Sequence, residues 1–327
     1  MMRIKSLLSG MISCFPGGNA WLFKRDIKRN PGVGNSNPRY CYSVWLRHLV
    51  LAKKYCGIKS APNVVAELGP GESLGTGLAA LISGANKYFA FDVVPHVKNK
   101  RNIHIFNELV KLFEKKENIP DSKEFPQIQT ELDDYSFPSD ILSDKLLQAS
   151  LKDERLAEIE LELINENKYG SKPSYITYVV PWYDINIIAP GSIDMIFSMS
   201  VLEHTDDLKT AYRASYNWLR ENGFMSHEID FRCHGHAQRW NGHWRYSDFV
   251  WRLMRGCRPY FINREAHTCH INLIKEHNFE IIADLQKFDK SGIKPQELAF
   301  RFKSLSNDDI YTYSAYILSR KVTDSSH

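Results

Sequence analysis

The stretch from Asn63 to Val94, NVVAELGPGESLGTGLAALISGANKYFAFDVV, decides how the rest of the chain is interpreted. A short apolar run ends at Glu67, a glycine-rich turn follows, and an apolar helix-like segment leads to a second strand-like run that ends at Asp92. This order of strand, glycine turn, helix, strand and acid is typical of nucleotide binding at the carboxyl edge of a parallel sheet. We therefore expect a ligand site beside this turn.

The spacing of the glycines indicates which ligand fits. A dinucleotide fingerprint has the pattern G-x-G-x-x-G, and the N-terminus of its helix faces a diphosphate. Here the run from Gly69 to Gly75 is one residue too long, and Glu72 would place a carboxylate beside that diphosphate. The turn therefore favours a cofactor without phosphates. An ordinary strand-to-helix turn in another doubly wound protein stays open as the alternative.

The residues of this turn resemble motif I of the class I S-adenosylmethionine (SAM) dependent methyltransferases. Glu67, Gly69 and Gly71 match the pattern E/D-x-G-x-G-x-G, and Ser73 stands where the third glycine is usual. The resemblance implies that the loop contacts the methionine and ribose parts of SAM. It also implies that Asp92, at the end of the second strand, binds the ribose.

A second motif lies further along the chain. Residues 192–204, SIDMIFSMSVLEH, resemble motif IV of the same methyltransferase class, and this resemblance implies that Ser198 and Glu203 lie along the floor of the cofactor site. Trp182 follows a predicted third strand, Tyr175 to Val180, at the edge where adenine lies in this fold. Trp182 therefore contacts the adenine or packs in the core, and the sequence leaves both readings open.

The resemblance covers residues 61–99 and 175–320 and implies an α/β fold with a Rossmann-like seven-stranded sheet. Five parallel core strands precede a terminal antiparallel hairpin in that fold. Residues 1–60 are then an N-terminal extension that includes a helix. Residues 100–174 are rich in Lys, Glu, Asp and Leu and exceed a normal crossover connection, so we expect an inserted helical subdomain that caps the sheet.

Candidate catalytic residues follow from the chemistry of methyl transfer. Displacement at a sulfonium methyl is in line, and a hydroxyl nucleophile must lose a proton. A histidine has a pKa near neutrality and is the natural base. Our candidates are His227 and His204, with Asp230 or Glu228 orienting an imidazole.

A metal ion is an alternative to a histidine base, since some sugar and catechol methyltransferases use one to acidify vicinal hydroxyls. The chain has no H-E-x-x-H spacing, so we name no metal ligand and expect the polar side chains to bond to one another or to substrate. Trp240, Trp244 and Tyr246 form a platform for the acceptor or cover the sheet edge. The residues that offer imidazole or carboxylate ligands are Glu228, Asp230, His234, His236 and His243.

Composition limits the partners and the setting. The 327 residues, 43% of them hydrophobic, can bury a full core in one large domain with additions or in two small ones. A net charge of +4 without a long basic run argues against dedicated nucleic-acid binding. Six cysteines without a C-x-x-C pair predict neither a zinc knuckle nor a disulfide framework, and they favour a reducing cytoplasm.

The N-terminal residues carry one more open question. Leu8, Met11, Ile12 and Phe15 recur at helical spacing in a stretch too short to span a bilayer. This pattern predicts a helix that packs on the protein or lies on a membrane surface.

The sequence as a whole therefore predicts a SAM-dependent methyltransferase that methylates a hydroxyl of a small molecule or glycan. A non-catalytic SAM-binding protein and an NAD-binding Rossmann protein are the alternatives.

Overall fold

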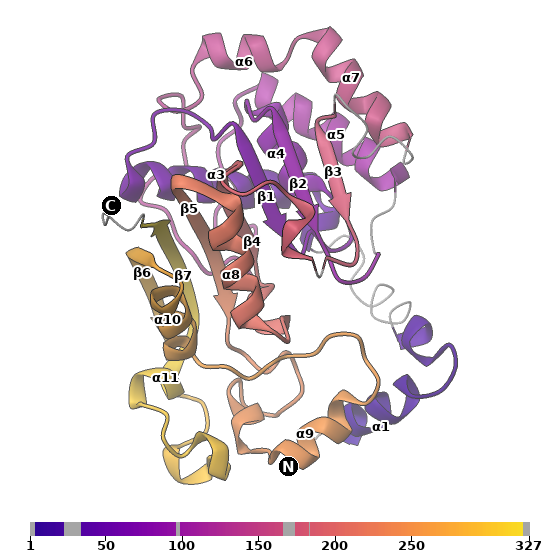
Figure 1. The fold of residues 1–327 in the computed structure, drawn as a ribbon, viewed down its shortest axis with the longest axis vertical. Coiled ribbons are helices and arrows are strands. Elements are labelled where there is room, and N and C mark those ends of the chain that lie inside the picture. The colour runs from indigo at the N-terminus through magenta and orange to yellow at the C-terminus, as the bar shows by residue number, and fades with distance from the viewer. Residues whose placement is uncertain (1–3, 23–33, 96–98, 166–173, 183, 323–327) are drawn as a thin grey trace.

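The computed structural model describes residues 4–22, 34–95, 99–165, 174–182 and 184–322. Their strands form one seven-stranded sheet in the order β3-β2-β1-β4-β5-β7-β6 (Figure 1). The first five strands pair in parallel, and β7 is antiparallel to both β5 and β6. This arrangement confirms the predicted Rossmann-like sheet with its terminal antiparallel hairpin. The strands are β1 (Val64–Leu68), β2 (Lys87–Phe91), β3 (Ile176–Val179), β4 (Ile193–Met199), β5 (Leu219–Asp230), β6 (Phe279–Phe288) and β7 (Thr312–Lys321).

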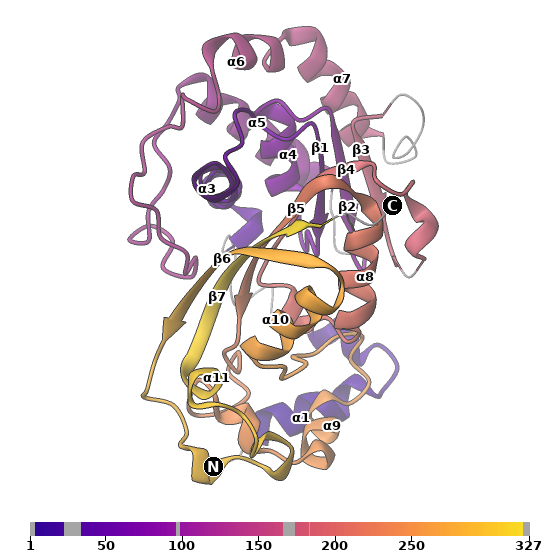
Figure 2. The same ribbon diagram turned by 60° about the vertical axis from the view of Figure 1, so that its left-hand side comes forward.

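Helices cover both faces of the sheet. One face carries α3 (Pro38–Cys56), α4 (Gly75–Ile82) and α5 (Asn99–Glu114), and the other carries α8 (Leu208–Trp218) and α10 (His267–Glu276) (Figure 2). Every residue of α4 is buried, which explains why its sequence is apolar on all sides. The two hydrophobic clusters therefore lie above and below one sheet, with the ends of the strands left for a ligand site.

Local signals set the limits of α3. The side chain of Asn37 accepts hydrogen bonds from the backbone N–H groups of Arg39 and Tyr40, and Pro38 occupies the first turn. Gly57 ends the helix in the left-handed conformation and donates its N–H to the carbonyl of Lys53. These residues set the two ends of α3, and the helix between them packs against α4.

The predicted insertion, residues 100–174, contains α5 together with α6 (Asp144–Ser150) and α7 (Asp153–Ile164). Buried side chains of all three helices belong to the same hydrophobic cluster as α3 and α4. The described part of this range therefore extends one helical layer of the sheet, and none of its residues lines the cavity described below. The domain limits given above stay a prediction.

A lower lobe faces the carboxyl ends of the parallel strands (Figure 1). It contains α1 (Ile4–Ser13), α9 (Asp248–Arg255) and α11 (Asn307–Tyr311). Asn263 joins this lobe to the sheet, because its side-chain amide donates to the carbonyls of Leu202 and Thr205 at 2.7 and 2.9 Å. The lobe therefore comes close to the loop that follows β4.

Helix α1 packs on α9 with its small residues and leaves its apolar residues exposed. Gly10 lies so close to α9 that a Cβ atom there would be 2.2 Å from the carbonyl oxygen of Leu253. The sequence predicted that this helix packs on the protein or lies on a membrane surface. The structure shows it packed on the protein, but its apolar face points away from α9. Its exposed fractions are 64% for Ile4, 50% for Leu8, 61% for Met11 and 69% for Phe15.

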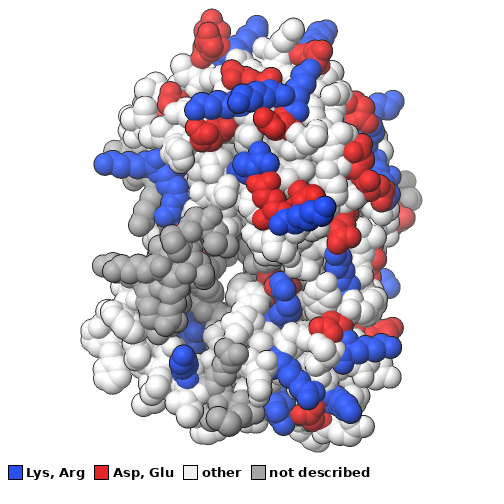
Figure 3. Space-filling view, turned by 180° about the vertical axis from the view of Figure 1, so that it is seen from behind, with Lys and Arg blue, Asp and Glu red and all other residues white. Residues whose placement is uncertain are grey.

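The surface around this helix carries few charges. Seen from behind, the lower left of the molecule shows basic side chains and no acidic ones, whereas both signs mix over the upper part (Figure 3). No helix in the described ranges is both long and apolar enough to cross a membrane.

A disulfide links Cys14, just after α1, to Cys257, just after α9. Cysteine spacing did not predict this bond, since the partners are 243 residues apart and meet only because α1 packs on α9. Disulfides persist mainly in oxidising compartments, so the predicted cytoplasmic location has to be tested against this bond.

Candidate functional site

A cavity of about 650 Å³ opens at the carboxyl ends of β1, β2 and β4. Pro259 and Tyr260 of the lower lobe close its other side. Four predicted cofactor residues (Gly69, Gly71, Asp92 and Trp182) and one predicted catalytic residue, His204, line it. The position agrees with the general rule that ligands bind beyond the carboxyl ends of strands in open α/β sheets.

The glycine turn has a backbone that only glycine adopts without strain. Gly69 and Gly71 have φ angles of 65° and 66°, in the left-handed region. A Cβ atom on Gly69 would lie 2.5 Å from Cγ1 of Val201. The turn can therefore approach the loop after β4 and a ligand only because these two positions have no side chain.

Asp92 connects the second strand to the glycine turn. Its Oδ2 accepts the N–H of Gly71 at 3.1 Å, and its Oδ1 accepts the N–H of Val93 at 2.7 Å. Oδ1 also accepts the N–H of Val94 at 3.3 Å, so these backbone bonds orient the carboxylate of Asp92 at the wall of the cavity. Trp182 donates its backbone N–H to the carbonyl of Asp92 at 3.2 Å, and its ring lies edge-on to Phe91 with centroids 6.0 Å apart.

The other four predicted cofactor residues are buried away from the cavity surface. Glu67 accepts a hydrogen bond from the hydroxyl of Tyr88 at 2.5 Å, and burial raises its pKa to about 8. Ser73 donates its hydroxyl to the carbonyl of Asn35. These two side chains support the turn from beneath, and their contact with a cofactor stays a prediction.

Ser198 lies inside the sheet layer with one of the catalytic candidates. Its hydroxyl is 2.8 Å from Nδ1 of His227, its neighbour on β5. His227 is 1% exposed, and burial, assisted by the nearby His48, lowers its pKa to about 3. The ring of His227 therefore stays neutral and does not reach the cavity surface in this conformation.

Acidic side chains outnumber basic ones around the cavity. Asp92, Asp206 and Asp207 line it, and of its described lining residues Arg213 alone carries a full positive charge. Asp206 also accepts two hydrogen bonds from Arg255, at 2.6 and 2.7 Å. The cavity is therefore better suited to a cationic ligand than to a diphosphate.

Glu72 does not have the role that the sequence suggested. Its carboxylate pairs with Arg101 at 2.5 Å and accepts the hydroxyl of Ser36 at 3.0 Å, so its charge is compensated outside the cavity. The objection to a diphosphate therefore rests on the aspartates, not on Glu72.

Glu228 and Asp230 orient groups other than His227. Glu228 accepts hydrogen bonds from the backbone N–H and the hydroxyl of Thr130, and so it anchors the segment before α6. Asp230 accepts from Arg232 at 2.7 Å and lies 3.2 Å from Nε2 of His234. Burial alone would raise the pKa of Asp230, but hydrogen bonds from His234 and Arg232 outweigh it and hold that pKa well below its usual range.

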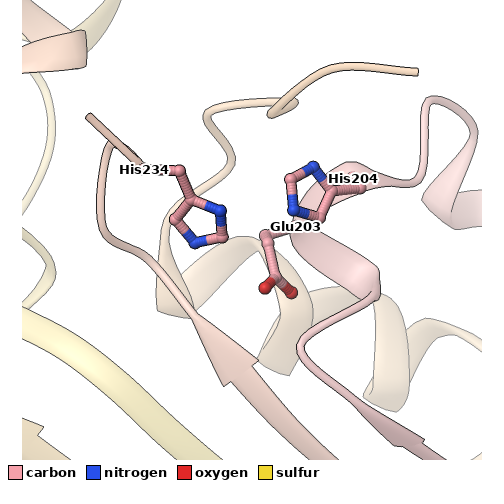
Figure 4. Close-up of side chains that lie close together, drawn as sticks. All are labelled: Glu203, His204 and His234. Carbon is pink, nitrogen blue, oxygen red and sulfur yellow. The ribbon is translucent and has the colours of Figure 1, made fainter. Parts of the chain in front are cut away.

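Glu203, His204 and His234 form a cluster at the edge of the cavity (Figure 4). Their ligand atoms all lie within 4.8 Å of one another, and the two imidazole rings are edge-on to each other with centroids 5.0 Å apart. Burial, reinforced by the charge of Asp230, raises the pKa of Glu203 well above its ordinary value. Burial and His234 lower the pKa of His204 to about 3. Sequence reasoning placed Glu203 on the cofactor floor and named His234 only among residues that offer metal ligands, and it did not foresee this cluster.

Several lining residues were missed for different reasons. Thr205 immediately follows the second motif and Thr210 lies in the first turn of α8 after it, so the approach of that segment to the cavity could have indicated them. Pro259 and Tyr260 come from the lower lobe, and no local pattern marks them. Of the two roles left open for the aromatic residues, Trp244 has the packing role, because it is fully buried among apolar side chains.

Comparisons with known proteins find solved structures that are similar at low sequence identity. No family model and no curated protein matches the chain. A SAM-dependent methyltransferase from Methanosarcina mazei is 10% identical with a TM-score of 0.43, covering 84% of this chain and 98% of that one. Phosphoethanolamine N-methyltransferase 2 from Haemonchus contortus, solved with SAM, is 13% identical with a TM-score of 0.42, covering 91% and 60%. The [4+2]-cyclase SpnF is 11% identical with a TM-score of 0.38, covering 84% and 80%. At these values the likenesses carry no argument about substrate or reaction.

Proposed function

We propose that this chain is a SAM-dependent methyltransferase that transfers a methyl group to a hydroxyl of a small molecule or glycan. The observation that carries the proposal is the meeting of the glycine turn, Asp92 and an acidic wall at one cavity on the carboxyl edge of the sheet. The resemblance of the two sequence motifs supports the same conclusion.

The charge of the cavity favours SAM over NAD. SAM has a positive sulfonium, whereas NAD brings a diphosphate that Asp92 and Asp207 would repel; the charge of the third aspartate, Asp206, is compensated by Arg255. In the proposed complex the backbone at Gly69 and Gly71 contacts the methionine part, Asp92 accepts from the ribose hydroxyls, and Trp182 lies beside the adenine. Glu67, Ser73, Ser198 and Glu203 would then shape the site from behind.

The proposed chemistry needs a group that takes the proton of the acceptor hydroxyl. His204 is the catalytic candidate that lines the cavity. His227 would need a rearrangement to touch substrate, because its ring is buried against Ser198. Asp230 would act as a positioning residue through His234. We therefore rank His204 first for contact with the acceptor.

Calorimetry with S-adenosylhomocysteine (SAH) and with NAD tests the cofactor. We expect SAH to bind one-to-one, and Asp92→Asn to weaken it by roughly 5- to 150-fold because a charged hydrogen bond worth about 1–3 kcal/mol is lost. Asp134→Asn is the matched control, because Asp134 is an exposed aspartate that does not line the cavity. Tighter binding of NAD than of SAH would refute the cofactor assignment.

Mass spectrometry of metabolites and glycans from cells with and without the gene tests the reaction. We expect one product to lose the mass of a methylene group when the gene is absent, and the Asp92→Asn gene to restore it poorly. SAH binding without any methylated product would instead indicate the non-catalytic SAM-binding alternative.

A further inference from the structure

We propose that Glu203, His204 and His234 bind a divalent transition-metal ion at the edge of the cavity. Two imidazoles and one carboxylate would hold the ion on one side, and the remaining coordination positions would face the acceptor. The binding site stands on its own geometry, whereas its role in methyl transfer rests on the proposed function.

The distances between the ligand atoms suit a metal site whose side chains move slightly closer together when the ion binds. An ion bound by imidazole and carboxylate lies about 2.1 Å from each donor atom, which puts neighbouring donors about 3 Å apart. The ligand atoms of the three side chains are already within 4.8 Å of one another. Rotations of the side chains that move each ligand atom by about 1 Å would complete the coordination. Figure 4 shows the two rings close together at a steep angle, with the carboxylate of Glu203 below them.

Two of the three ligands have buried polar atoms that lack a hydrogen-bond partner, although only Glu203 is buried as a whole residue and His204 is half-buried. Glu203 is 2% exposed, and neither of its carboxylate oxygens makes a hydrogen bond within the described residues. Nδ1 of His204 is also buried and unpartnered. Proteins rarely leave buried polar atoms unpaired, so these atoms point to a missing ligand. One cation would interact with all three of these atoms, the two carboxylate oxygens of Glu203 and Nδ1 of His204.

The third ligand, His234, is already oriented for coordination. Its Nε2 lies 3.2 Å from Oδ2 of Asp230, which leaves Nδ1 available for an ion. Metal-binding histidines almost always donate their other nitrogen to a carboxylate or carbonyl in this manner. His234 also has a φ of 42°, which is unusual for a residue with a side chain, and Gly235 follows it with a φ of 79°. This turn directs His234 back toward His204.

The donor set selects the kind of ion. Two imidazoles and one carboxylate suit Zn²⁺, Fe²⁺, Co²⁺ or Mn²⁺, whereas Mg²⁺ and Ca²⁺ prefer oxygen donors throughout. Three protein ligands leave open positions for water or for acceptor oxygens. The proposed ion therefore belongs to the first transition row and binds its substrate directly.

With the ion bound, His204 would be a ligand and no longer a base, and the ion would activate the acceptor as a Lewis acid in its place. A hydroxyl bound to it loses its proton to solvent more readily, which gives an alkoxide or phenolate. That oxygen forms a bond to the methyl carbon of SAM while the carbon–sulfur bond breaks. The electron pair of the broken bond stays on sulfur and leaves neutral SAH. No oxidant or reductant takes part.

Metal titration of the full chain tests the site without any need for activity. Protein freed of its purification tag and treated with chelator is titrated with Zn²⁺ by calorimetry and with Co²⁺ by visible absorption. We expect one ion per chain, at least 100-fold weaker binding for His234→Ala, and about 10- to 100-fold weaker binding for Asp230→Asn. His234 is partly exposed, so its replacement should leave the fold intact.

His236→Gln is the matched control, because its ring packs on Phe261 and lies outside the cluster. We expect it to bind the ion as the unaltered chain does. Equal binding by the unaltered chain and His234→Ala, or no binding by either, would overturn the metal site. SAH calorimetry on the same samples separates the two proposals. SAH binding without an ion rejects the metal site alone, and an ion without SAH binding rejects the proposed cofactor.

Discussion

Replacing Gly69 by alanine tests the geometry on which the proposed cofactor site depends. The backbone there is left-handed, which costs a residue with a side chain about 1 kcal/mol. The new Cβ would also lie 2.5 and 2.7 Å from the two methyl carbons of Val201, and overpacking of this kind costs about 1–3 kcal/mol. The expected total is therefore about 2–4 kcal/mol.

The free-energy cost of Gly69→Ala can appear either in the stability of the fold or in the affinity for SAH. If the turn keeps its shape, the free energy of unfolding falls; if the turn shifts to relieve the clash, SAH affinity falls instead. Urea unfolding at saturating SAH measures the sum of both effects, and calorimetry measures the loss of affinity alone. A loss of 2–4 kcal/mol taken entirely in affinity equals roughly a 30- to 1,000-fold weaker Kd.

Val201→Ala is the matched partner for this experiment, because it removes the methyl groups that the new Cβ would meet. In the double variant only the backbone strain remains, so the two substitutions should show a coupling of about 1–3 kcal/mol. The reasoning would be refuted if Gly69→Ala bound SAH and unfolded like the unaltered chain, or if Val201→Ala recovered nothing.

Three further predictions concern stability and surface. Burial lowers the pKa of His48 and of His270 to about 3, so their neutral form stabilises the fold fully above about pH 6.5 and this contribution is lost as the pH falls. These two groups should contribute about 3 kcal/mol to the loss that urea unfolding shows at pH 5.5 relative to pH 7.5, and His204 and His227 should add to it in the same direction; equal stability would contradict this. Cys14→Ser should release α1 from α9, so limited proteolysis should cut the N-terminal segment while the SAH affinity stays unchanged; protection equal to that of the bonded chain would count against it. The exposed apolar face of α1 should bind vesicles of anionic lipid in a flotation assay, and replacing Leu8 and Met11 by serine should weaken that binding by more than tenfold. Self-association without vesicle binding would show that the face pairs with a second copy.

Elements with local signals were predictable from the sequence. The order of β1, α4 and β2 follows from apolar runs and glycines within 32 residues, and α3 begins and ends at residues with known capping behaviour. The position of the glycine turn and of Asp92 follows from the same short stretch. These parts depend on neighbours in the chain, which a sequence pattern records directly.

The remainder of the site depends on contacts between distant segments. Asn263 draws the lower lobe onto the loop after β4, and this brings Tyr260 over His204, with ring centroids 6.0 Å apart. No periodicity in the sequence encodes that contact. The roles within the dense polar segment were ambiguous for the same reason, because strand register alone cannot tell that Asp230 bonds to His234 and that His227 faces Ser198.

The proposed metal ion should affect the binding of SAM and of SAH differently, because only SAM carries a positive charge at sulfur. SAM has a positive sulfonium and SAH has a neutral sulfur, while the rest of the two molecules is the same. An ion at Glu203, His204 and His234 would repel the sulfonium until the acceptor loses its proton, and the resulting negative oxygen between them would be stabilised by both charges. Saturating Zn²⁺ should therefore weaken SAM binding and leave SAH binding nearly unchanged, and the difference should vanish in His234→Ala. An equal effect of Zn²⁺ on both ligands would show that the ion acts on the shape of the cavity and not through its charge on the methyl donor.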